Sequence, residues 1–157
     1  MRIIEILKPE NIIIGFKGTT KTEVINELLD TFVGDERVRD VEAVRTVVLE
    51  REKIMSTGVG EGFAIPHGKT DMVTGMVAGF GVLKNPIDFE ALDNLPVNLI
   101  FLLVGQEDAV AQHIKMLSRV SRIMSKENIR ENLSECQTAE EVLKIFEEEE
   151  SKYLELS

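Results

Sequence analysis

Cysteine and histidine are scarce in this chain. Its 157 residues include one cysteine, Cys136, and two histidines, His67 and His113. A single cysteine excludes an internal disulfide bond, and so few thiol and imidazole groups leave little material for a zinc site. Because free cysteine is usually buried, we interpret Cys136 as a core residue of a helix rather than as a reactive thiol.

Long apolar runs are also lacking. The longest, Leu99 to Val104, is far shorter than the roughly 20 residues that cross a bilayer. The N-terminus carries a charge at Glu5 and has no apolar core of the length found in secretion signals. We therefore expect a cytoplasmic protein that does not insert into a membrane.

Positive charge is in deficit. The 18 Lys and Arg residues are outnumbered by 28 Asp and Glu residues, which gives a formal net charge of −10. This balance argues against nucleic acid and anionic membranes as partners and favours a basic partner. The alternative is a solvated acidic surface, since the run Glu147 to Glu150 could be the frayed end of a helix.

The remaining composition is that of an ordinary globular protein, with 43% hydrophobic and 29% charged residues. A chain of 157 residues is long enough to build one core around one sheet. No internal repeat, low-complexity linker or domain boundary interrupts it. We therefore expect residues 1–157 to form a single domain.

Strand and helix patterns alternate along the chain. Strands are predicted from β-branched or apolar segments at 11–14, 63–65, 76–83 and 97–104, with turns at Asn85-Pro86 and at 93–96. Helices are predicted after the capping residues Thr20 and Asp40, over 106–124 and 125–133, and from a capping box at Thr138. Because the 97–104 segment is nearly all apolar, it should be buried on both faces of a sheet that helices cover on both sides.

The stretch from Thr57 to Lys69 carries the strongest candidate for a site. Three glycines at alternate positions form a segment that we interpret as a mobile loop whose backbone amides could approach an anion. It leads into the short apolar strand Phe63–Ile65 and then into Pro66, which places His67 at a strand end. An imidazole there can act as a base, a metal ligand or a nucleophile toward phosphorus. The alternative is a glycine-rich turn beside a surface histidine.

This stretch is part of a longer pattern. Glu52 is followed after six residues by Val59-Gly60 and, after two more, by the run Phe63 to Gly68. The pattern resembles the signature of the mannitol/fructose-type enzyme IIA domain of the bacterial phosphoenolpyruvate-dependent sugar phosphotransferase system. Further matches extend over nearly the whole chain: Arg51-Glu52, Ile87-Asp88-Phe89, Ala91-Leu92-Asp93, Gln112-His113-Ile114 and Leu117-Ser118. One departure is Phe63, where the family usually carries an aliphatic residue, and it concerns packing rather than chemistry.

The resemblance implies a fold, a reaction and its partners. The fold would be α/β, a three-layer α/β/α sandwich on a mixed β-sheet, which agrees with the predicted order of elements. His67 would accept a phosphoryl group from the phosphocarrier HPr and pass it to an enzyme IIB component during sugar uptake. His113 and Arg51 would support this transfer, and no metal or other cofactor would be required. We expect HPr to bind a small apolar patch near Phe63 and the glycine loop.

Each supporting residue also has a structural interpretation. Arg51 presents a planar fork of donors that suits phosphoryl oxygens, but it could instead pair with Glu50 or Glu52 at a helix end. His113 falls beside the apolar stripe of its helix and could be a residue at the edge of the core. Lys69 is a candidate electrostatic helper that no motif assigns.

Two other functions remain open. The nitrogen-type enzyme IIA shares the motif, and there phosphorylation of His67 would control binding of a regulatory target protein without sugar transport. The other is a metal-dependent hydrolase built on His67 and His113, although two histidines alone would leave the metal under-coordinated.

Overall fold

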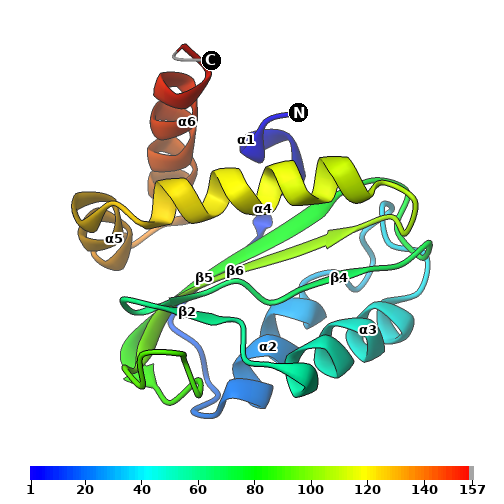
Figure 1. The fold of residues 1–157 in the computed structure, drawn as a ribbon, viewed down its shortest axis with the longest axis horizontal. Helices are drawn as coiled ribbons and strands as arrows, with labels where there is room; N and C mark the ends of the chain where they lie inside the picture. Colours follow the sequence, from blue (N-terminus) through cyan, green and yellow to red (C-terminus); the bar gives the residue numbers. More distant parts are fainter. Residues whose placement is uncertain (156–157) are drawn as a thin grey trace.

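The computed structural model describes residues 1–155 (Figure 1). Its strands are β1 (Leu7–Ile14), β2 (Gly58–Gly60), β3 (Phe63–Ala64), β4 (His67–Lys69), β5 (Val77–Ile87) and β6 (Val97–Gly105). Its helices are α1 (Ile3–Ile6), α2 (Lys21–Asp30), α3 (Val41–Ile54), α4 (Val110–Met124), α5 (Glu127–Ser134) and α6 (Ala139–Glu155). No helix in this part of the chain has the length and apolar character that crossing a bilayer requires.

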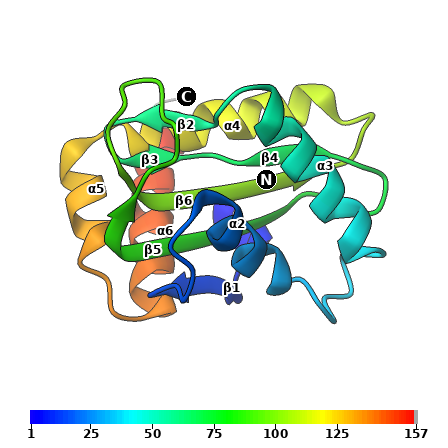
Figure 2. The same ribbon diagram turned by 90° about the horizontal axis from the view of Figure 1, so that it is seen from below.

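The strands form one mixed sheet that is organised around β6 (Figure 2). The strand order is β1-β5-β6-β3-β2, and β4 also pairs with β6. β5 and β6 are antiparallel, whereas β3 and β4 run parallel to β6, and β1 runs parallel to β5. β3 pairs with Leu99 and Ile100 and β4 with Leu103 to Gly105, so the two short strands follow each other along one side of β6. The side of the sheet is interrupted between them, at Ile65 and Pro66.

Helices cover both faces of this sheet. α2 and α3 lie on one face, and α1, α4, α5 and α6 lie on the other (Figure 1). Phe80, Phe101 and Phe146 pack edge to face on the α6 side, and Phe32 belongs to a second buried cluster on the α2 and α3 side. β6 contributes side chains to both clusters, which confirms the predicted burial of 97–104 on two faces. The predicted three-layer α/β/α sandwich on a mixed sheet is therefore the observed fold.

The predicted N-terminal caps of α2 and α3 are confirmed. Thr20 accepts a hydrogen bond from the Glu23 amide at the start of α2, and Asp40 accepts one from the Ala43 amide at the start of α3. Each side chain satisfies an amide that the first helical turn leaves without a partner. The starts of α2 and α3 are therefore encoded locally.

Two predicted boundaries are wrong: the start of the first strand at residue 11 and the turn at Asn85-Pro86. β1 begins at Leu7 and runs through Pro9, and β5 continues to Ile87 through the predicted turn at Asn85-Pro86. The pairing register of each strand shifts across its proline. β1 is also an edge strand, where a residue without an amide hydrogen is tolerated. The prolines therefore mark irregular places in strands and not their ends.

The acidic run near the end of α6 is not a frayed tail. Glu149 is buried and pairs with Lys126 at 2.8 Å. Glu150 is fully buried, and its carboxylate accepts a hydrogen bond from the Ile3 amide at 2.7 Å and pairs with Arg119 at 2.8 Å. These two carboxylates are neutralised within the fold, and Glu150 joins α6 to the start of α1.

Cys136 is buried as predicted, but it is not part of a helix. It lies between α5 and α6, and its Sγ donates a hydrogen bond to the Asn132 carbonyl at 3.4 Å. Burial raises the pKa of the thiol. The helical pattern is broken here because Thr138, two residues later, caps α6 by accepting from the Glu141 amide.

Candidate functional site

His67 is the first residue of β4, immediately after the interruption at Ile65 and Pro66. It is held in place by the ladder to β6, in which it pairs with Leu103, whose amide donates to the Pro66 carbonyl at 3.0 Å. Nδ1 of the imidazole lies 2.9 Å from the Ile65 carbonyl oxygen. A carbonyl oxygen only accepts hydrogen bonds, so Nδ1 carries the proton and Nε2 keeps its lone pair.

The surroundings of His67 favour the neutral imidazole. The side chain is half-buried, and this burial is the main factor that lowers its pKa. The positive charges of Arg51 and Lys69 lower the pKa further, against the opposing effects of the Ile65 carbonyl and Glu52. At neutral pH the ring is therefore uncharged, which is the form that can act as a nucleophile.

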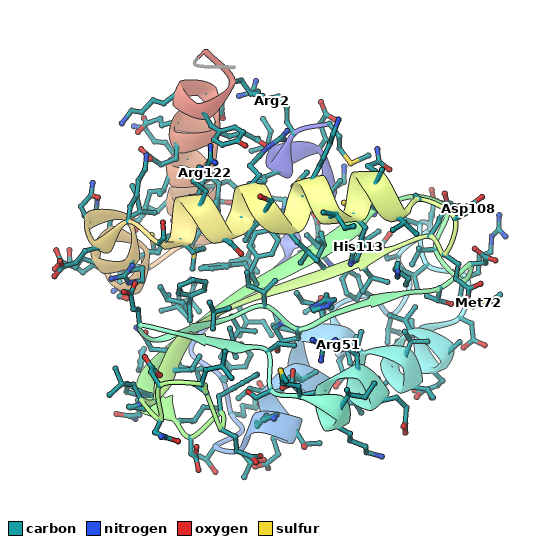
Figure 3. All side chains as sticks on the ribbon, in the orientation of Figure 1. Arg2, Arg51, Met72, Asp108, His113 and Arg122 are labelled. Atoms are coloured by element: carbon teal, nitrogen blue, oxygen red, sulfur yellow. The ribbon has the colours of Figure 1, made fainter. Side chains whose placement is uncertain are left out.

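His113 lies beside His67, as the resemblance implied. It projects from the first turn of α4 toward the sheet (Figure 3), and its ring centroid is 5.8 Å from that of His67. The residue is 3% exposed, and neither ring nitrogen has a hydrogen-bond partner among the described residues. Burial, followed by the positive charges of His67 and Lys69, lowers the pKa of His113 to about 4. A buried neutral imidazole with an unused N–H therefore accompanies the candidate nucleophile.

Gly105 at the end of β6 makes room for this second imidazole. A Cβ at this position would lie 2.9 Å from Nδ1 of His113, closer than side chains normally approach. A larger residue would force the His113 ring or the strand end to shift. Gly105 gives no signal in the sequence, because a lone glycine at a strand end is indistinguishable from an ordinary turn residue.

Arg51 lies in the last turn of α3 and reaches the site from the opposite helix layer (Figure 3). Its Nη1 donates to the Met55 carbonyl at 2.8 Å, and its charge acts on His67. Among the described residues, Glu50 pairs with Lys53 and Glu52 pairs with Lys21, so neither carboxylate is a partner of Arg51. The alternative interpretation of Arg51 as part of a helix-end ion pair is therefore wrong.

Glu52 positions this part of the site, a role that the sequence analysis did not assign. It is only 6% exposed, and its carboxylate accepts hydrogen bonds from the Thr57 amide at 2.8 Å and from the Thr57 hydroxyl. Lys21 of α2 lies 3.0 Å from the same carboxylate. Glu52 thereby joins the end of α3 to the start of β2. A glutamate in a charged helix end gives no sign in the sequence that it will be buried.

The glycine-rich segment is a hairpin and not the expected mobile loop. β2 and β3 are antiparallel. Gly60, the last residue of β2, and the connecting residues Glu61 and Gly62 have φ angles of 123°, 56° and 89°. Asp93 holds this turn, since its Oδ2 accepts from the Glu61 amide at 2.8 Å. The Gly58 amide is likewise used internally, by the Ser56 hydroxyl. The expectation that the amides of this loop would bind an anion is therefore wrong for Gly58 and Glu61.

The apolar surface near the site lies elsewhere than expected. Phe63 is 3% exposed and belongs to the core, so it cannot form a docking patch. Exposed apolar side chains instead follow the site residues in sequence: Ile54 and Met55 follow Arg51, and Ile114 follows His113. Ile54 is 80% exposed and Ile114 is 59% exposed. These three side chains are called the apolar rim below.

Within residues 1–155, no three His, Cys, Asp or Glu side chains are grouped so that they could hold a metal ion. The two imidazoles of the site are therefore not joined by a third ligand of these types in the described part of the chain.

Similar proteins are known. The family described as "Phosphoenolpyruvate-dependent sugar phosphotransferase system, EIIA 2" matches residues 5–149. The "PTS system fructose-specific EIIABC component" of Bacillus subtilis is 34% identical over 146 residues, which make up 93% of this chain but 23% of that protein. The "Nitrogen regulatory protein" of Bradyrhizobium diazoefficiens is 35% identical over 146 residues, which make up 93% of this chain and 95% of that protein.

A similar structure has also been solved. The crystal structure of nitrogen regulatory protein IIA-Ntr from Neisseria meningitidis has a TM-score of 0.84 and 34% sequence identity, over 90% of this chain and 97% of that chain. Relatives of both the fructose-type and the nitrogen-regulatory kind are thus similar to nearly the whole of the chain.

Proposed function

The chain belongs to the EIIA 2 family of the phosphoenolpyruvate-dependent sugar phosphotransferase system, whose members are phosphotransfer components, and from this premise we propose that it is a phosphocarrier. HPr donates a phosphoryl group to Nε2 of His67, and an enzyme IIB component accepts it during uptake of a sugar of the fructose or mannitol type. Residues 1–157 act as a single enzyme IIA domain, and the exchange takes place in the cytoplasm. The observation that carries the proposal is the hydrogen bond from Nδ1 of His67 to the Ile65 carbonyl, which leaves Nε2 as the nucleophile.

The transfer step needs no proton to leave Nε2. The lone pair of Nε2 attacks phosphorus in line with the phosphorus–nitrogen bond of the phosphohistidine on the donor. A new phosphorus–nitrogen bond forms on His67, the old one breaks, and its electron pair returns to the donor imidazole. The proton stays on Nδ1 throughout and remains hydrogen-bonded to the Ile65 carbonyl oxygen. Transfer to enzyme IIB reverses these roles.

Arg51 and His113 support the step through the charge on the phosphoryl group. In the transition state this charge is spread over three equatorial oxygens, so donors that are already in place contribute most. Arg51 uses Nη1 on the Met55 carbonyl, and its other guanidinium N–H groups are available for an oxygen. The buried N–H of His113 lacks a partner in the described structure and would gain one from a phosphoryl oxygen.

HPr is the partner that we assign to the apolar rim. A transient contact needs modest apolar area close to the reacting groups and fast release, which a few exposed side chains provide. Ile54, Met55 and Ile114 lie within a few residues of Arg51 and His113 in sequence and meet this requirement. The net charge of −10 would add long-range attraction to a basic partner surface.

A nitrogen-type regulatory function is the second candidate. It is supported by the nitrogen regulatory relative, which is 35% identical and is matched over 95% of its length. In this alternative the same chemistry occurs at His67, but the phosphorylation state controls the binding of a target protein and no sugar is moved.

Incubation with phosphoenolpyruvate, enzyme I and HPr, followed by mapping of the modified residue, tests the proposal. We expect one phosphoryl group on His67. Stoichiometric labelling of His113 or of any other residue would overturn it. Adding enzyme IIB proteins of the fructose and mannitol types then separates the two candidates: discharge of phospho-His67 supports the sugar branch, and retention of the label supports the regulatory one.

A further inference from the structure

The geometry of β4 places Lys69, a second cation besides Arg51, on the same face of the strand as His67. Successive side chains of a strand point to opposite faces, so His67 and Lys69 share one face and Gly68 has the other. The Gly68 face is packed against α3, because a Cβ there would lie 2.8 Å from Cγ1 of Val47. The side chains of His67 and Lys69 therefore point toward the layer of α4, and the contact between the rings of His67 and His113 agrees with this.

Lys69 is exposed and takes part in no ion pair within residues 1–155. Burial is the main factor that lowers the pKa of both imidazoles, and the charge of Lys69 lowers both further. Lys69 is thus a cation beside two neutral imidazoles, and no carboxylate pairs with it in the described structure. On the same face, the buried His113 ring has no hydrogen-bond partner for either nitrogen. Both observations indicate that an anion binds between Lys69 and the His113 ring.

We propose that Lys69 is a further catalytic residue, whose ammonium group binds an equatorial oxygen of the phosphoryl group during transfer and on phospho-His67. This inference rests on the proposed function of His67. Arg51 approaches from the α3 layer and Lys69 lies on the strand itself, so the two cations would hold the phosphoryl group from two sides. The flexible stem of lysine lets its compact charge follow the phosphoryl group as it moves from donor to acceptor.

Removal of the positive charge of Lys69 has two measurable consequences. Phospho-His67 loses a favourable contact that unphosphorylated His67 does not make, so the transfer equilibrium shifts back toward phospho-HPr. The forward rate falls because the transition state carries the same charge. A charge contact of this kind near a protein surface contributes on the order of 1.4 kcal/mol, which corresponds to about a tenfold change in either constant.

The experiment compares Lys69→Gln and Lys69→Arg with Lys144→Gln as the matched control. Lys144 is exposed on α6, which packs against β1 and α1, and its replacement changes the net charge by the same amount. Rates and end points of phosphoryl transfer from phospho-HPr are measured in single-turnover reactions. We expect about tenfold losses of rate and equilibrium constant for Lys69→Gln, and wild-type values for Lys144→Gln. Lys69→Arg keeps the charge and should retain most of both.

NMR titration of His67 gives an independent measurement. Removal of a nearby positive charge should raise the pKa of His67 in Lys69→Gln and leave it unchanged in Lys144→Gln. If Lys69→Gln matches Lys144→Gln in rate and equilibrium while His67 is phosphorylated in the wild type, the inference is wrong and the proposed function stands. If the wild type is not phosphorylated on His67, both are wrong.

Discussion

At the scale of single residues, the site depends on which nitrogen of His67 carries the proton. The Ile65 carbonyl fixes the proton on Nδ1. Burial, and after it the neighbouring cations, lower the pKa of His67 and so keep the ring neutral. The reactive nitrogen is therefore selected by one backbone carbonyl of the chain itself. Changes at His67, Arg51 and His113 test different parts of this arrangement.

Replacement of His67 by alanine should abolish phosphorylation and leave the protein folded. The half-buried ring makes one hydrogen bond, so its loss should cost about 1 kcal/mol of unfolding free energy. Mass spectrometry after the carrier reaction measures the label, and thermal unfolding measures the fold. His113→Ala is the matched control, which should still be labelled on His67 but more slowly. A label of full stoichiometry on His67→Ala would show that another residue is the acceptor.

Replacement of Arg51 by lysine should slow the transfer without preventing it. Lysine keeps the charge but loses the planar fork that can bind two oxygens at once, and we expect a loss of about tenfold. Arg45→Lys is the control on the same helix, because its guanidinium pairs with Asp30 and Glu42 and not with the site. Equal single-turnover rates for the two variants would remove Arg51 from the reaction.

His113 should make the stability of the protein depend on pH. Burial first, and then the charges of His67 and Lys69, lower the pKa of His113 from 6.5 to about 4. As the pH falls through this interval the unfolded state takes up the proton first, so the folded state loses roughly 3 kcal/mol of stability. Above about pH 6.5, the ordinary pKa of histidine, the contribution of His113 to stability is constant.

Urea unfolding of the wild type and of His113→Gln at several pH values measures this effect. The free energy of unfolding should fall toward low pH more steeply in the wild type, because the carboxyl groups that titrate in the same interval are common to both proteins. Parallel curves would mean that His113 is protonated as easily in the folded as in the unfolded state.

The residue types of the site were largely visible in the sequence, but their partners were not. His67, His113 and Arg51 occur in motifs whose spacing marks them. The Glu52 carboxylate and the ammonium of Lys69 belong to the site because of the folded structure. Glu52 is buried by the chain that follows it, and the alternation of side chains along β4 determines which way Lys69 points. Neither property leaves a local pattern.

At the scale of elements, the short strand β4 determines where His67 points. The residues His67, Gly68 and Lys69 carry no β-branched or large apolar side chain, so no periodicity predicts a strand. The strand forms because β6 offers unpaired hydrogen-bonding groups beside it. In contrast, β6 and the capped helices α2 and α3 were predictable, because their apolar content and their caps are local signals.

Gly68→Ala should separate β4 from α3. The added Cβ would lie 2.8 Å from Cγ1 of Val47, and we expect a loss of about 1–3 kcal/mol in unfolding free energy together with slower transfer. Gly75→Ala is the control, because nothing lies within 4 Å of a Cβ at that position. Val47→Ala added to Gly68→Ala should recover part of both losses. If Gly68→Ala is as stable and as active as Gly75→Ala, the close packing of this strand has no role.

At the scale of the whole molecule, the net charge of −10 should accelerate the encounter with a basic carrier. Raising the ionic strength from about 0.05 to about 0.5 M shortens the Debye length from roughly 14 to 4 Å. We expect the second-order transfer from phospho-HPr to slow over this range, whereas the first-order rate within the preformed complex stays nearly constant. Stopped-flow experiments at varied protein concentration measure the second-order and the first-order rate constants. A second-order rate that is insensitive to salt would show that the acidic surface is only solvated.

The link between Glu150 and the Ile3 amide has a mechanical consequence. α1 and α6 lie together on one face of the sheet, whereas α3 lies on the other (Figure 1). A tensile load applied between α1 and α6 acts on the hydrogen bond from the Ile3 amide to Glu150 and on the other contacts between these two helices. The ladder between β4 and β6 lies outside this path. Pulling α1 and α6 apart should therefore break the hydrogen bond between Ile3 and Glu150 without acting directly on the strand pairing that orients His67.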